Sequence, residues 1–132
     1  MEKLYRTDHN YKSIHKSIHK FKSRIINCLT QMYMRPNESV KLGNVVGIFP
    51  EVFIQVRLEN IKHVNYQRQP IINIIMVCDT VFNSKGFEYS THLNLSVNAY
   101  VYWETSEADI MKTCINLFEN LKNLKYYANY SN

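Results

Sequence analysis

Apolar and polar residues alternate along an unusually long stretch of this chain, between His92 and Trp103. A strand points successive side chains to opposite faces, so a period of two places one set of residues on each side of a sheet. The pattern predicts a long strand with one buried face. Its apolar positions are Leu93, Leu95, Val97, Ala99, Val101 and Trp103.

Three further segments are typical of strands. Residues 40–49 are mostly apolar but are interrupted by Gly43 and Gly47. Residues 52–58 alternate, with Val52, Ile54, Val56 and Leu58 on one side and Phe53, Gln55 and Arg57 on the wet side. Residues 70–82 are almost continuously apolar, which favours a strand covered on both faces. A hairpin turn is expected at 83–86, which contains Gly86. Residues 40–103 therefore predict a sheet of about four antiparallel strands.

Helices are predicted on both sides of this sheet in the sequence. Residues 11–35 repeat apolar side chains every three or four positions and meet Pro36, which stops a helix. Residues 105–125 show a second such stripe, with Thr105 or Ser106 as the N-cap. Residues 1–10 are interpreted as an extended arm and 126–132 as a polar, aromatic tail. We expect one α+β domain over residues 1–132, with the C-terminal helix packed on the sheet.

The length and composition agree with a globular intracellular protein. The chain has 132 residues, 45% of them hydrophobic, which fits a single domain with a substantial core. There is no apolar run of about 18 residues, as a membrane span requires, and no apolar signal-peptide core near Met1. Cys28, Cys78 and Cys114 lie far apart in apolar segments, which predicts buried reduced thiols.

The net charge of +5 lies entirely in the first 24 residues. Residues 1–24 hold seven basic and two acidic side chains, and the remainder holds nine of each. Such asymmetry predicts a contact with an acidic partner. The candidate interface residues are Lys12, Lys16, Lys20, Lys22 and Arg24. A nucleic acid, an acidic protein and a solvated helix face all remain open as explanations of this basic helix.

No motif of enzymatic chemistry is present. The sequence contains no G-x-S-x-G, no phosphate-binding P-loop and no G-x-G-x-x-G. Glu104, Glu107 and Asp109 cluster at a predicted helix start, where capping and the helix dipole explain them. His15 and His19 are spaced for a metal, but lysines surround them and surface histidines are the simpler interpretation. We expect no catalytic residues, cofactor, metal or small-molecule substrate.

Two segments resemble the tail-completion and tail-terminator proteins of long-tailed phages. The first is Ile-Phe-Pro-Glu-Val-Phe-Ile at 48–54, and the second is the strand at 92–103 followed by Glu-Thr-Ser-Glu-Ala-Asp-Ile at 104–110. The chain departs from that family by an additional strand at 71–82 and by the lack of a strand after the last helix. A related neck or tail-ring protein is an equal interpretation.

The resemblance implies a viral structural protein of the virion, assembled in the host cytoplasm. It would form a homo-oligomeric ring in the head–tail connector of a bacteriophage and join the portal or neck to the tail. Its partners would be copies of itself, other connector proteins and DNA in the channel. The tyrosines expected at subunit contacts are Tyr100, Tyr102, Tyr126, Tyr127 and Tyr130, although AT-rich codons also explain why the chain has ten tyrosines. A small basic nucleic-acid-binding module acting through the N-terminal helix is the alternative.

Overall fold

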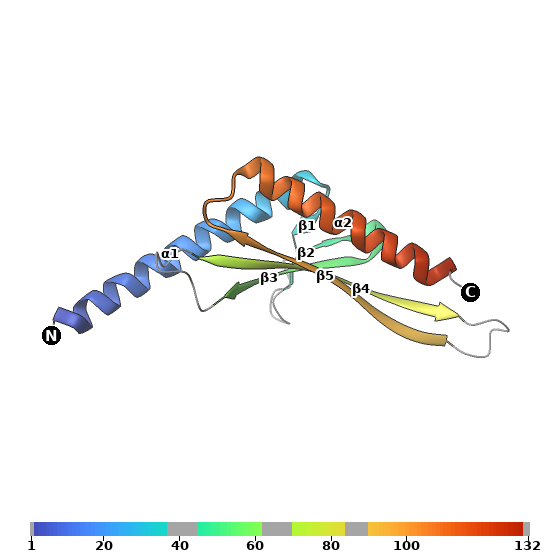
Figure 1. The fold of residues 1–132 in the computed structure, drawn as a ribbon, viewed down its shortest axis with the longest axis horizontal. Coiled ribbons are helices and arrows are strands. Elements are labelled where there is room, and N and C mark those ends of the chain that lie inside the picture. Colours follow the sequence, from blue (N-terminus) through green and yellow to red (C-terminus); the bar gives the residue numbers. More distant parts are fainter. Residues whose placement is uncertain (1, 37–44, 62–69, 84–89, 131–132) are drawn as a thin grey trace.

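The computed structural model describes residues 2–36, 45–61, 70–83 and 90–130, and the side chains of 17–36, 45–61, 70–79 and 93–126. The chain forms a helix, a five-stranded antiparallel sheet and a second helix, in that order. Figure 1 shows both helices on the same side of the sheet. The predicted α+β class is confirmed, with five strands where the sequence indicated about four.

The first helix, α1, spans Glu2–Gln31 and is longer at its start than expected. Residues 2–10 are helical, and the helix replaces the extended arm predicted there. Neither Gly nor Pro occurs before Pro36, so no residue of this segment opposes helical backbone geometry. The N-terminal half of α1 projects beyond the sheet in Figure 1, and the described core residues of α1 lie in its C-terminal half.

At its C-terminal end, α1 closes with a pair of backbone hydrogen bonds that turn the chain toward the sheet. The amide of Met34 donates to the carbonyl of Leu29 at 3.3 Å, and the amide of Tyr33 donates to Thr30 at 3.1 Å. This arrangement, a Schellman motif, places Tyr33 in the left-handed region at φ 69°. The helix therefore ends before residue 35, and Arg35–Pro36 forms the edge strand β1.

The sheet is a meander in which every strand pairs with its neighbour in the sequence, in the order β1-β2-β3-β4-β5. The two longest strands, β4 and β5, have 13 residues each and pair along their whole length without a bulge. The predicted turn at 83–86 lies almost wholly outside the described residues. Beyond β1, the strands are β2 (Val45–Phe49), β3 (Ile54–Ile61), β4 (Ile71–Asn83) and β5 (Ser90–Tyr102).

A short 3-10 turn, η2 (Pro50–Val52), separates β2 from β3. The alternation predicted from Val52 therefore becomes a strand only at Ile54. Phe53 adopts a left-handed conformation at φ 56° and is 74% exposed. The proline at the start of η2 favours this turn because its ring fixes φ and it has no amide hydrogen for the ladder.

The second helix, α2, spans Glu107–Tyr130 and covers β4 and β5. Ser106 is the N-cap, as its Oγ accepts a hydrogen bond from the amide of Asp109 at 3.2 Å. The helix continues past residue 125, where a non-helical tail was predicted. The chain has no Gly or Pro after Gly86, so nothing in the sequence breaks the helix there.

A single hydrophobic core joins the two helices to one face of the sheet. Phe118 of α2 lies 4.5 Å from Phe49 of β2 between ring centroids, and Phe21 of α1 meets Trp103 edge-on at 5.7 Å. Truncating a fully buried aliphatic residue in such a core typically costs about 2–5 kcal/mol. The core residues contributed by the helices are Phe21, Ile25, Cys28, Leu29, Ile110, Cys114, Leu117 and Leu121.

Candidate interaction surfaces

One face of the sheet packs on the helices and the other, which we call the open face, does not. On the packed face β3 and β4 bury Ile54, Val56, Leu58, Ile72, Ile74, Met76 and Cys78, each no more than 3% exposed. Side chains between these positions point the other way because strand residues alternate. The open face comprises Gln55, Arg57, Glu59, Ile71, Asn73, Ile75, Val77, Asp79, Asn94, Ser96, Asn98, Tyr100 and Tyr102.

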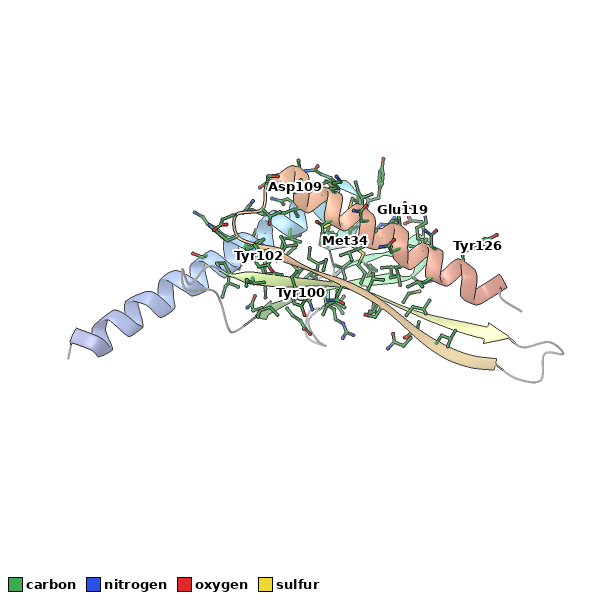
Figure 2. The ribbon with its side chains drawn as sticks, in the orientation of Figure 1. Met34, Tyr100, Tyr102, Asp109, Glu119 and Tyr126 are labelled. Carbon is green, nitrogen blue, oxygen red and sulfur yellow. The ribbon has the colours of Figure 1, made fainter. Side chains whose placement is uncertain are left out.

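The open face carries an apolar strip beside two exposed tyrosines. Ile71, Ile75 and Val77 lie along β4 and are only partly buried. Tyr100 and Tyr102 lie on the adjacent strand β5 and are 56% and 53% exposed. Figure 2 shows Tyr100 on the side of the sheet away from the outer surface of α2. Within the described residues both helices pack on one face of β4, so they do not form the cover that was predicted for its other face.

A polar pair interrupts this strip. Asn73, on β4, is 8% exposed, and its Oδ1 accepts a hydrogen bond from Nδ2 of Asn98 at 3.0 Å. A buried amide without a partner would cost free energy, and this contact satisfies its oxygen. The pair ties β4 to β5 through side chains as well as through the backbone. The two amide groups therefore place a hydrogen-bonded polar pair among the apolar residues of the open face.

A shallow groove of about 370 Å³ crosses one end of the open face. Its lining includes two opposite charges, Arg57 and Asp79, together with Phe53 and Asn94. The amine of Lys125 lies 5.5 Å from the Phe53 ring centroid and donates to the carbonyl of Val52 at 3.0 Å. This cation holds the exposed phenyl ring near the end of α2, and the groove offers both an apolar wall and charged groups.

Of the predicted basic residues, Arg24 has an intramolecular role. Its Nε lies 2.9 Å from Oε1 of Glu107, and its two terminal nitrogens donate to the carbonyls of Trp103 and Thr105 at 3.1 and 2.8 Å. The guanidinium also lies 5.5 Å from the ring centroid of Phe21. Arg24 therefore joins α1 to the turn before α2, and its donors are engaged within the chain instead of facing an acidic partner.

The structure gives a partial view of the predicted basic surface. Lys20 is exposed and Lys22 is partly buried on α1. Lys12 and Lys16 lie in the projecting part of the same helix, but their side chains are outside the described set. Residues four apart lie on the same face of a helix, so Lys12, Lys16 and Lys20 share one face of α1.

The predicted tyrosine contacts separate into two groups. Tyr100 and Tyr102 lie together on the open face, whereas Tyr126 is 58% exposed near the end of α2. Tyr127 and Tyr130 belong to α2, and their side chains are outside the described set. The sequence did not indicate Tyr33, which is the most exposed large hydrophobic residue described, at 86%.

The cysteines match buried thiols. All three are free and buried. Burial raises the pKa of the Cys114 thiol to about 12, and it also raises the pKa of Cys28, where the Glu107 carboxylate adds to the effect and Arg24 opposes it. A protonated thiol is a poor nucleophile. Among the described residues, no group of three His, Cys, Asp or Glu side chains is arranged to hold a metal ion.

Comparison with protein-family models, with curated proteins and with solved structures finds no match. Within the described residues no helix has the length and hydropathy needed to cross a membrane.

Proposed function

We propose that this chain is a non-enzymatic structural protein that assembles with other protein subunits through the open face of its sheet. The observation that carries the proposal is the apolar strip of β4, with Tyr100 and Tyr102 exposed beside it. An antiparallel sheet can leave one face in contact with water when that face carries polar side chains. The open face instead carries Ile, Val and Tyr side chains, which favours its burial against another protein. Aromatic residues are enriched at protein interfaces because they bury a large area and keep a polar tip.

The specific form that we propose is a subunit of a phage head–tail connector or tail-completion ring in the virion. Its support is the resemblance of residues 48–54 and 92–110 to that family. In the structure these segments form the end of β2 with η2, and β5 with the start of α2. Ring contacts through the open face, with the portal, neck or tail as neighbours, would use the tyrosines at 100 and 102.

Nucleic-acid binding through α1 is the second candidate, favoured by the position of the charge. Residues 1–24, with their net charge of +5, include the part of α1 that projects beyond the sheet in Figure 1, and Lys12 and Lys16 lie in that part. A free basic helix neutralises phosphates and gains affinity from the release of counterions. Within a connector, the same helix would face DNA in the channel or an acidic surface of a neighbouring ring.

Cryo-electron microscopy of the particle that contains this chain tests the proposal. We expect density for a symmetric ring of this chain at the head–tail junction, with the open face at a subunit contact. Tyr100→Ala/Tyr102→Ala should abolish incorporation into particles, and Tyr33→Ala, which removes a more exposed tyrosine outside the open face, should not. Absence of the chain from purified particles would refute the connector assignment.

A titration of the chain with duplex DNA or RNA distinguishes nucleic-acid binding from the ring-subunit function. A nucleic-acid-binding module should bind duplex DNA or RNA with an affinity that falls steeply as salt rises, and Lys12→Glu/Lys16→Glu should remove that binding. Tyr100→Ala/Tyr102→Ala would leave it unchanged. A ring subunit would instead bind its protein neighbours and show little affinity for duplex alone.

A further inference from the structure

The two edges of the sheet differ in how well they are protected. At one edge, the described part of β1 is Arg35–Pro36, and both residues are exposed. A charged residue, a proline and a very short strand are the features that keep an edge from pairing with another chain. At the other edge lies β5, whose 13 residues pair on one side with β4.

Strand β5 lacks these protective features. Ser90–Tyr102 contains no Lys, Arg, Asp, Glu, Pro or Gly, and its pairing with β4 runs without a bulge. Such a strand has no ionised side chain and no bulge, and in the order of the described sheet its second edge has no neighbour. It presents a row of backbone donors and acceptors, which is a template for a further strand.

The packed face of β5 is also incompletely covered. Its apolar residues Leu95, Val97 and Ala99 are only partly buried, whereas their partners on β4, Cys78, Met76 and Ile74, are at most 1% exposed. On α2, Phe118 and Lys125 contact β2 and the turn after it. Leu124, 44% exposed, lies about 120° around the helix from Phe118 and so away from the flank that contacts β2. Apolar surface is therefore left exposed both on α2 and on the packed face of β5.

We propose that β5 pairs with β5 of a second copy of this chain, antiparallel and around a two-fold axis, so that two sheets join into one. The strand is complementary to itself. A register with Ser96 on the axis places Leu95 opposite Val97 of the second copy and Leu93 opposite Ala99, all on the packed face. Because β5 carries no ionised side chain near the axis, two copies meet there without repulsion of like charges.

The partner strand is β5 and not the opposite edge, since Arg35–Pro36 blocks that edge over the described residues. The contact is isologous and closes after two copies. It therefore goes beyond the proposed ring, whose neighbours meet head to tail, and it uses the edge of the sheet instead of the open face.

Charged residues introduced into β5 test the proposed β5–β5 dimer. The full chain should sediment as a dimer, and Asn94→Lys/Ser96→Lys should raise the dimer dissociation constant by about tenfold or more, because like charges would converge across the axis. Asn94→Glu/Ser96→Glu should weaken the dimer similarly. An equimolar mixture of the two variants should recover a one-to-one heterodimer. Both positions are exposed, so the fold is retained.

The matched control is Gln31→Lys/Gln55→Lys, which adds the same two charges at exposed positions outside β5. It should dimerise like the unmodified chain. A chain that stays monomeric at every soluble concentration would overturn the proposal, as would a dimer that Asn94→Lys/Ser96→Lys does not weaken. Incorporation into particles is measured separately, with the Tyr100→Ala/Tyr102→Ala variant. A wrong β5–β5 dimer proposal and a wrong connector assignment therefore give different results.

Discussion

Arg24 and Glu107 form an ion pair at 2.9 Å that connects the C-terminal half of α1 to the first turn of α2, 83 residues later in the chain. Glu107 is 65% exposed at its side chain, so the ionic contact alone contributes little. The stronger contribution comes from the two backbone carbonyls that the same guanidinium caps, which lie in the turn between β5 and α2. A charged donor to a partly buried carbonyl is worth about 1.5–3 kcal/mol.

We therefore expect Arg24→Ala to lower the free energy of unfolding by about 2–3 kcal/mol. Glu107→Gln should cost less than about 1 kcal/mol, since the carbonyl contacts of Arg24 remain. Urea denaturation followed by far-ultraviolet circular dichroism measures both values. Lys20→Ala, which removes an exposed cation from the same helix, is the control. Equal stability of Arg24→Ala and Lys20→Ala would contradict this role.

Tyr33 stores backbone strain at the end of α1. Its φ of 69° is the left-handed conformation that glycine adopts without a steric penalty, and its side chain is 86% exposed, so it contributes little packing. We expect Tyr33→Gly to raise the free energy of unfolding by about 1 kcal/mol. Gln31→Gly, two residues earlier within the helix, should lower it by a similar amount. Thermal unfolding of the two variants gives opposite shifts if the strain is real.

Gly47 is required for a close approach between β2 and the end of α1. A Cβ atom at Gly47 would overlap the thioether of Met34, which is buried. Gly47→Ala should therefore lower the free energy of unfolding by about 1–3 kcal/mol. Met34→Ala removes the obstructing atoms, so the double variant should be more stable than the sum of the single effects predicts. A double-mutant cycle by denaturant titration measures the coupling, and strictly additive effects would show that the two side chains do not meet.

Cys114 links stability to alkaline pH. Burial raises its pKa to about 12, whereas an unfolded thiol titrates near pH 8.5–9, so the folded state holds its proton more tightly. The resulting stabilisation is complete below about pH 8.5 and is lost as the pH rises toward 12, at up to about 1.4 kcal/mol per pH unit. The difference in unfolding free energy between the unmodified chain and Cys114→Ala should therefore shrink above about pH 9. A difference independent of pH up to 11 would contradict the assignment.

The helices and strands could be predicted from periodic patterns in the sequence, but the contacts between them could not. The alternation over 92–103 corresponds to β5, and the helical stripe over 105–125 corresponds to α2. Both patterns are local, so the sequence alone was enough to recognise them. Element ends were less accurate. Tyr33 takes a conformation usual for glycine, and nothing in its residue type indicates it.

The role of Arg24 shows why the surfaces were harder to predict than the fold. In the sequence it is one of several basic residues on a helix. Its partners lie 79 to 83 residues away, and no local pattern records that distance. Tyr100 and Tyr102, in contrast, were placed on the wet face of their strand by alternation alone, and the structure has them exposed.

The separation between Arg24 and Glu107 has a consequence for synthesis on the ribosome. The meander can close one hairpin at a time as it emerges, but Phe21 of α1 meets Trp103, and α1 packs chiefly on α2, which is made last. At about 5–20 residues per second, the apolar side of α1 waits roughly 4–20 seconds for its cover. The nascent chain is thus most exposed to chaperones and to misassembly at its first helix, most of which lies in the segment that carries its net positive charge.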